Sequence, residues 1–103
     1  MLESAYLTCL AYELHAAGLS FELQKPLPLV YKGVRLDAVY RADMVVARRV
    51  LVEIKALDTV APVHVRQLQT YVQLADCRVA LLVNFGAAVM RDGIKRVVNR
   101  FPE

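Results

Sequence analysis

Two acids and a lysine interrupt apolar, strand-like runs in the middle of the chain. Asp43 lies within residues 41–46 (RADMVV), and Glu53 and Lys55 lie within residues 50–55 (VLVEIK). Residues two apart on a strand point to the same face of a sheet, so Glu53 and Lys55 share a face. An ionised group among core-forming residues must be paired, hydrogen-bonded or bound to a metal ion. Two carboxylates beside a lysine are the groups that hold a divalent cation next to a scissile phosphate.

Whether Asp43 can join Glu53 depends on the connection between the two runs. In antiparallel strands directly opposed residues share a face, so the acids share one only if paired residue numbers sum to an even value. That requires a connection of three or five residues. A two-residue turn at Arg48-Arg49 would place Asp43 opposite Ile54 and send its carboxylate to the far face. Two-residue hairpins favour Asn-Gly or Asp-Gly, which residues 47–49 lack, so we predict a longer connection or a bulge.

A plainer interpretation of these acids and the lysine is a structural salt bridge at the end of a strand. The nearby polar residues also have two interpretations. Gln67 and Tyr71 lie four apart on a predicted helix, where an amide and a phenol could together steady a phosphate or a water. Taken singly, Gln67 is a surface residue, Tyr71 a core residue, and His64 a surface residue near the helix start. Glu3 lies in the first turn of another predicted helix, where a carboxylate complements the helix dipole.

The sequence predicts two helices to position these groups. Residues 2–17 repeat apolar side chains at spacings of three and four, and Gly18 supplies a C-terminal stop. Pro62 opens the second helix, which runs to about Ala75 and carries an apolar stripe bordered by Tyr71.

Runs rich in β-branched and other apolar residues, bounded by turn residues, predict strands. Pro26 and Pro28 are expected to break the extended chain, because proline cannot donate to a ladder. Residues 94–98 fit either a last strand or a helical turn. The expected extended segments are 21–24, 27–31, 34–39, 41–46, 50–56 and 78–84, with a turn at 32–33.

The order helix, several strands, helix, strand is typical of a layered α/β domain with a mixed central sheet flanked by helices. The run at residues 78–84 (RVALLVN) is apolar enough for a central position in that sheet. With 103 residues, the chain is expected to form one domain over residues 1–103, built on one core.

The composition of the chain limits the kinds of partner that we expect for it. The 57% hydrophobic content exceeds the usual share, which either core filling or a self-association surface, and hence a homo-oligomer, would explain. No apolar run approaches the roughly 20 residues that span a bilayer, so no membrane partner is expected. The net charge of +3 suits a polyanion without identifying one. No secretory leader and no CxxC spacing are visible, so we expect a cytoplasmic protein with Cys9 and Cys77 as reduced core thiols.

Short motifs follow one another in a defined order along the chain. They are Glu3-Ser4-Ala5-Tyr6 (ExxY), Tyr31-Lys32-Gly33, Arg41-Ala42-Asp43, Val52-Glu53-Ile54-Lys55, Pro62-Val63-His64, Gln67-Leu68-Gln69-Thr70-Tyr71 (QxxxY), Asn84-Phe85-Gly86 and Asp92-Gly93-Ile94-Lys95-Arg96. Their order and spacing resemble the PD-(D/E)XK nuclease superfamily, and more closely its small GxxExxY proteins, over nearly the whole chain. The glycine of GxxE would fall one position before Met1, so the chain begins inside that motif.

The resemblance implies a restriction-endonuclease-like core and a site for Mg²⁺ or Mn²⁺. In that site Asp43 and Glu53 bind the ion with the Ile54 carbonyl, and Glu3 contacts metal-bound water. Lys55 orients the attacking water or offsets charge growing on the phosphate. The resemblance also implies that Gln67 and Tyr71 support the phosphate or the site geometry, and it leaves Arg41, Lys32 and Arg35 as candidates for contacts to a nucleic-acid backbone.

The implied function is a metal-dependent phosphodiester hydrolase, a nuclease acting on DNA or RNA. A second hypothesis is a catalytically inactive nuclease-like module that binds nucleic acid or protein through the same groove. A third is a structural dimer whose acids are paired internally. The presence of two acids and a lysine favours the enzyme, because a binding module needs no such set. The small size favours the module, because little surface remains to grip a substrate.

Overall fold

The computed structural model describes residues 2–99, apart from the side chains of residues 37–39. Residues 1 and 100–103 of the expected domain lie outside this range. The elements in chain order are α1 (Leu2–Ala16), β1 (Phe21–Tyr31), β2 (Val34–Val46), β3 (Val50–Lys55), α2 (Pro62–Leu74), β4 (Val79–Asn84), the 3₁₀ helix η1 (Met90–Gly93) and β5 (Ile94–Val98).

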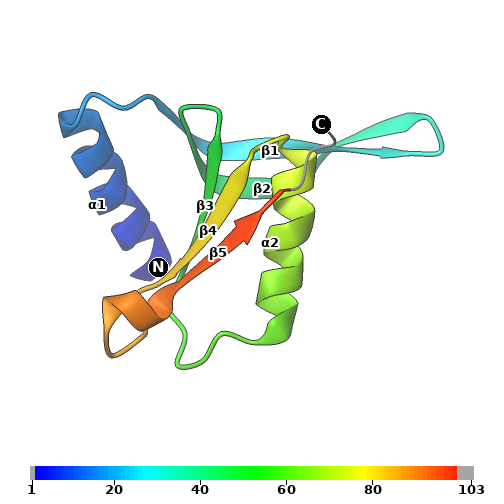
Figure 1. The fold of residues 1–103 in the computed structure, drawn as a ribbon. Helices are drawn as coiled ribbons and strands as arrows, with labels where there is room; N and C mark the ends of the chain where they lie inside the picture. The colour runs from blue at the N-terminus through cyan, green and yellow to red at the C-terminus, as the bar shows by residue number, and fades with distance from the viewer. Residues whose placement is uncertain (1, 100–103) are drawn as a thin grey trace.

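The strands form one five-stranded sheet in the order β1-β2-β3-β4-β5. Strands β3 and β4 are parallel, because α2 carries the chain back across the sheet between them, and the other neighbouring pairs are antiparallel. Figure 1 shows α1 and α2 on opposite sides of the sheet. This confirms the predicted α/β architecture, a mixed sheet flanked by helices.

Two apolar layers hold the helices on the sheet. On one face, Leu68 and Tyr71 of α2 belong to a cluster with Leu51 of β3. On the other face, Leu7 of α1 clusters with Ile54 of the same strand. Residues 51–54 of β3 are all buried, which is the pattern of a central strand covered on both sides.

Two predictions about strand extents are wrong. Residues 21–31 form one strand rather than two segments, and residues 34–46 likewise form one strand. Strand β1 lies at the edge of the sheet and pairs with β2 alone, where a missing N–H is tolerated. Pro26 and Pro28 therefore remain inside the strand. The register shifts between Leu27 and Leu29, so the strand accommodates the second proline with an irregularity instead of ending.

The far ends of β1 and β2, residues 29–36, form an arm that extends beyond the rest of the sheet (Figure 1). The predicted turn is present at its tip, where Lys32 and Gly33 both have positive φ. Apolar residues on the arm are exposed: Val30 by 65%, Tyr31 by 60% and Val34 by 58%.

Two smaller expectations also need correction. Cys9 is exposed rather than a core thiol, because the solvent-facing side of α1 also carries apolar residues. Cys77 is buried as expected. His64 is half-buried rather than a surface residue, since its Nδ1 accepts a hydrogen bond from the Ala61 N–H at 2.9 Å and so caps the start of α2. Within residues 2–99, no helix is long and apolar enough to cross a membrane.

Candidate active site

The hairpin between β2 and β3 has the register that a shared acid site requires. Val46 pairs with Val50, and Met44 pairs with Val52, so the residue numbers sum to an even value and Asp43 comes opposite Glu53. The connection is the three-residue segment 47–49, closed by a hydrogen bond of 3.0 Å from the Arg49 N–H to the Val46 carbonyl. The longer connection predicted from the lack of Asn-Gly or Asp-Gly is confirmed.

Beyond Met44 the two strands are joined by carboxylates instead of ladder bonds. The Asp43 N–H donates to Glu53 Oε1 at 2.9 Å, and the Ile54 N–H donates to Asp43 Oδ2 at 2.8 Å. Each carboxylate thus reaches across the gap between β2 and β3. One of its oxygens accepts a hydrogen bond from a backbone N–H of the opposite strand. Each has a second carboxylate oxygen that can face an ion. We call this arrangement, defined by Asp43, Glu53 and Ile54, the acid fork.

The acid fork is electrostatically unfavourable when both acids are charged. Glu53 is only 6% exposed, and its pKa is raised from an ordinary 4.5 to about 7, first by burial and then by the charge of Asp43. The pKa of Asp43 is also raised, mainly by burial, although the Ile54 N–H and Lys55 lower it. Two carboxylates that resist ionisation together are a donor set that a divalent cation would stabilise.

The backbone of Ile54 completes the donor set. The Lys55 carbonyl accepts from the Phe85 N–H at 2.8 Å, so it points away from the fork, toward the end of β4. Successive residues of a strand direct their backbone groups to opposite sides. The Ile54 carbonyl therefore points toward β2, on the same side as its N–H, which reaches Asp43. This is the side on which the resemblance requires a carbonyl ligand.

Glu3 comes to the same end of the sheet from α1. Its Oε2 accepts a hydrogen bond from the Ala56 N–H, just beyond β3, at 3.2 Å. The charge of Glu3 also contributes to raising the pKa of both Asp43 and Glu53, so the three carboxylates share one electrostatic environment. Within residues 2–99, however, no three His, Cys, Asp or Glu side chains are grouped as a metal cage.

The residues present therefore fit one kind of ion. A hard divalent cation such as Mg²⁺ takes one or two carboxylates and keeps several waters, and it does not need a cage of protein ligands. Asp43, Glu53 and the Ile54 carbonyl would hold such an ion, and Glu3, which bonds the Ala56 N–H at the same end of the sheet, would add a further negative charge nearby. A zinc site of the usual Cys and His type does not fit this donor set.

Lys55 is half-buried at the end of β3. Its positive charge lowers the pKa of both Asp43 and Glu53, so its ammonium group lies in their vicinity. No ion pair joins it to either acid within the described part of the chain. The structural salt bridge is thus not formed, because backbone N–H groups take up the inward carboxylate oxygens. The ammonium group remains available to a third partner.

Gln67 and Tyr71 come together on α2 as their spacing predicted. Gln67 Nε2 donates to Tyr71 Oη at 3.1 Å, and the Tyr71 ring packs against Tyr40 with centroids 5.4 Å apart. Tyr71 is a core residue, yet its hydroxyl is close enough to the fork for the charge of Glu53 to raise its pKa, after burial as the main cause. The two residues thus border the fork from the α2 side.

The basic candidates do not gather at the fork. Arg41, two residues from Asp43, is exposed, and its Nη1 is 3.5 Å from the Gln24 carbonyl. Lys32 and Arg35 lie on the arm, where Lys32 Nζ is 5.6 Å from the centre of the Tyr31 ring. The three follow β2 outward from the acids instead of surrounding them.

Asn84 is an important residue that sequence analysis did not single out beyond its place in a motif. Buried at the end of β4, it accepts from the Leu57 N–H at 2.8 Å and from the Gly86 N–H at 3.1 Å, and donates to the Leu57 carbonyl at 2.9 Å. A Cβ on Gly86 would collide with the Leu57 backbone. The Asn84-Phe85-Gly86 motif therefore fixes the chain that leaves β3 just after Lys55.

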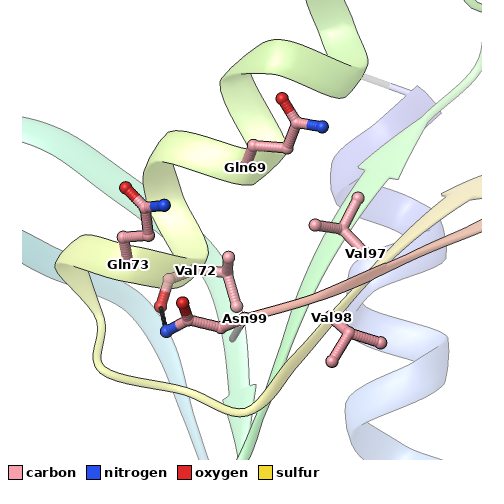
Figure 2. A pocket seen from close by; sticks show the side chains of 6 residues that line it. All are labelled: Gln69, Val72, Gln73, Val97, Val98 and Asn99. Atoms are coloured by element: carbon pink, nitrogen blue, oxygen red, sulfur yellow. Dashed lines mark hydrogen bonds between the residues drawn. The ribbon is translucent and has the colours of Figure 1, made fainter. Parts of the chain in front are cut away.

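A hollow of about 270 Å³ between α2 and β5 does not belong to this chemistry (Figure 2). At its end, Asn99 Nδ2 donates to the Val72 carbonyl at 3.4 Å and to the Cys77 carbonyl at 3.0 Å, which fastens β5 to the end of α2. None of its six lining residues carries a charge at neutral pH. They are Gln69, Val72, Gln73, Val97, Val98 and Asn99.

Comparison with known proteins shows the family of the chain. The model of the PD-(D/E)XK nuclease superfamily matches residues 1–97. The fold is similar to that in the crystal structure of SSO0001, with a TM-score of 0.63 at 20% sequence identity, a level that shows the fold alone. That match covers 99% of this chain and 52% of SSO0001, so the chain spans about half its length. No curated protein matches the chain. The core is restriction-endonuclease-like, and the chain belongs to the PD-(D/E)XK nuclease superfamily.

Proposed function

We propose that this protein is a divalent-metal-dependent phosphodiester hydrolase acting on nucleic acid. The observation that carries the proposal is the acid fork, where two partly buried carboxylates oppose each other with no ion pair to neutralise them. In a purely structural role the pair would be compensated only by two backbone N–H groups and the charge of Lys55, which leave the pKa of both acids raised. The domain proposed for this activity is the single unit over residues 1–103.

In the proposed reaction each residue has a distinct task. Asp43, Glu53 and the Ile54 carbonyl hold Mg²⁺ or Mn²⁺, which supplies an activated water and stabilises charge on the phosphate. Lys55 orients the attacking water or balances the negative charge that grows on the phosphoryl oxygens. Glu3 accepts a hydrogen bond from water on the open side.

Gln67 and Tyr71 serve as support in this proposal. Their mutual hydrogen bond fixes the amide and the phenol on the α2 side of the fork, where Tyr71 is held by the core. Either group can contact a phosphate oxygen or keep the orientation of Glu53.

The basic residues along β2 are the proposed grip on the substrate. Arg41 lies next to the fork, and Arg35 and Lys32 continue outward to the tip of the arm. Backbone contacts of this kind bind phosphates without reading sequence. The exposed Tyr31 ring beside Lys32 adds a surface on which a base can stack.

Within the superfamily, we propose the GxxExxY group. The ExxY motif has a physical role in support of this assignment, because Glu3 bonds the end of β3 and Tyr6 stacks on Phe85 with centroids 4.1 Å apart. Tyr6 thereby contacts the Asn84-Phe85-Gly86 motif directly. The first motif and the Asn84-Phe85-Gly86 motif therefore meet beyond the end of β3.

An inactive binding module remains the second candidate, favoured by the observation that Arg41, Arg35 and Lys32 follow the β1–β2 hairpin outward instead of surrounding the acids. A cleavage assay decides between the two. Wild type and Asp43→Asn are incubated with Mg²⁺, Mn²⁺ or EDTA over single-stranded, double-stranded and branched DNA and RNA. We expect cleavage of at least one substrate with a metal, and none by the variant or in EDTA. Binding without cleavage under every condition would support the module instead.

A further inference from the structure

Gln24 has an unusual backbone for a residue inside a strand. It lies in β1, and its φ is +50, in the left-handed region that side chains other than glycine rarely adopt. The other described non-glycine residues with positive φ are in turns, namely Lys32, Ala47, Arg48 and Asp76. A turn explains their conformation, but no turn explains that of Gln24.

The irregularity lies directly opposite Asp43. The β1–β2 register passes from Leu23 with Met44 to Lys25 with Ala42 and omits the pair between them, which is Gln24 with Asp43. The ladder is thus interrupted at the one position where β2 carries its acid.

The interruption changes which way β2 side chains point. In a regular strand, Ala42 and Val45 would face opposite sides of the sheet. Both pack instead in the cluster beneath α2, while Met44 packs beneath α1. The strand therefore rotates between residues 42 and 45, although the register with β1 is the same before and after this point.

This rotation governs the position of the Asp43 carboxylate. Asp43 faces a hollow of about 200 Å³ that it lines with Glu3, Ser4, Leu7 and Gln24, while its Oδ2 still reaches the Ile54 N–H on β3 at 2.8 Å. The carboxylate is thus open on one side and fixed on the other.

We propose that Gln24 is a positioning residue, whose left-handed backbone rotates β2 so that the Asp43 carboxylate lies at the cation position of the acid fork. The role belongs to the backbone conformation and not to the amide side chain. The proposal rests on the proposed metal centre, and it names a residue that contributes no ligand to it.

Two substitutions separate the backbone from the side chain. Gln24→Gly removes the side chain but keeps the left-handed conformation accessible. Gln24→Val resists that conformation, because a β-branched residue is a genuine outlier there. The matched control is Asp76→Val, which opposes a φ of +54 in the turn after α2, at a residue with no proposed role in the site.

The first readout is Mn²⁺ affinity, measured by calorimetry on protein whose fold is checked by circular dichroism. We expect Gln24→Gly to bind within about twofold of wild type, Gln24→Val to bind at least tenfold more weakly, and Asp76→Val to bind like wild type. Wild-type affinity in Gln24→Val would overturn the proposal. Should Gln24→Val not fold, a tenfold loss in Gln24→Gly would overturn it, because the side chain would then matter.

The second readout needs no metal. Hydrogen exchange of the Ile54 amide reports its bond to Asp43, and we expect protection to be kept in Gln24→Gly and lost in Gln24→Val relative to neighbouring β3 amides. Equal protection in both variants would refute the positioning role whether or not Mn²⁺ binds. Conversely, wild type that binds no Mn²⁺ but shows this exchange pattern would refute the metal centre and leave the positioning role intact.

Discussion

Two polar side chains are buried on neighbouring strands, and hydrogen bonds compensate the burial of one far better than that of the other. Among the described residues, the buried polar or charged ones are Glu53 on β3, 6% exposed, and Asn84 on β4, 3% exposed. Asn84 is neutral, and its amide makes three hydrogen bonds to backbone groups. Glu53 has one hydrogen bond to the Asp43 N–H, and the Asp43 charge opposes its ionisation.

The difference separates a structural polar residue from a functional one. Each bond of Asn84 satisfies a backbone group that would otherwise lack a partner, so the whole side chain contributes to the folded state. Glu53 lies in a site that disfavours its own charge, which is a cost to folding unless an ion compensates it. The comparison predicts that truncating Asn84 destabilises the folded protein, whereas neutralising Glu53 stabilises it without metal.

Asn84→Ala is expected to have the largest effect on stability. It leaves the Leu57 N–H and carbonyl and the Gly86 N–H without their partner, which costs about 4 kcal/mol in the free energy of unfolding. Urea denaturation measures the loss. The matched control is Asn99→Ala, which removes a half-buried amide with two weaker, donor-only bonds and should cost about 1 kcal/mol. Equal losses in both variants would remove the special role given to Asn84.

Lys55→Ala should affect catalysis rather than folding. Because Lys55 forms no ion pair with the acids in residues 2–99, its removal should leave the melting temperature nearly unchanged, yet slow cleavage by roughly a hundredfold or more, as when one electrostatic stabiliser is lost. Lys95→Ala, an exposed strand lysine, controls for the loss of charge. Normal turnover in a destabilised Lys55→Ala protein would make Lys55 a structural residue.

The third effect is the pH dependence of the metal-free protein. The pKa of Glu53 is raised from 4.5 to about 7, so the folded state holds this proton more tightly than the unfolded chain does. The stability is therefore fully present below about pH 4.5 and decreases as pH rises through 7, by about 3 kcal/mol. Denaturation in EDTA across this range measures it, and Glu53→Gln should flatten the curve while the exposed Glu22→Gln should not. A wild-type stability that rises over this interval would contradict the raised pKa.

The smallest effect concerns the arm. Replacing Lys32 or Arg41 by glutamine should weaken nucleic-acid binding severalfold and reduce the slope of log affinity against log salt by roughly one each. Fluorescence anisotropy at several salt concentrations gives both numbers. Arg91→Gln, in the exposed η1 segment, is the control with the same change in charge. Binding that does not depend on salt would exclude an electrostatic grip.

The sequence carried enough information to predict the acid fork, because local chemistry decides it. The lack of a two-residue turn signal at 47–49 predicted the longer connection, which gives the register of Met44 with Val52, and the next residues, Asp43 and Glu53, are joined by a hydrogen bond from the Asp43 N–H to Glu53 Oε1. The spacing of Gln67 and Tyr71 likewise predicted their contact, since positions four apart on a helix always lie on one side.

Features that depend on tertiary position could not be predicted in this way. Pro26 predicts a break in the strand when only the neighbouring residues are considered. Because β1 is an edge strand, it tolerates the proline. Gln24 has no residue-type signal for a left-handed backbone, because the conformation occurs where β1 passes Asp43 of β2 and not in a turn of the local sequence. Leu57, a hydrogen-bond partner of Asn84, lies 27 positions away in sequence. The spacing of residues within a motif does not predict a contact over that separation.

The most direct test of the account is Mn²⁺ binding to the acid fork, measured by calorimetry in wild type and in the Asp43→Asn, Glu53→Gln double variant. The matched control, Glu13→Gln with Asp92→Asn, removes the same charge from exposed positions. We predict one Mn²⁺ per chain in wild type and in the control, and at least a hundredfold weaker binding in the double variant, which should nevertheless be folded and no less stable in EDTA. Equal Mn²⁺ affinity in all three proteins would contradict the claim that the two acids form a metal centre.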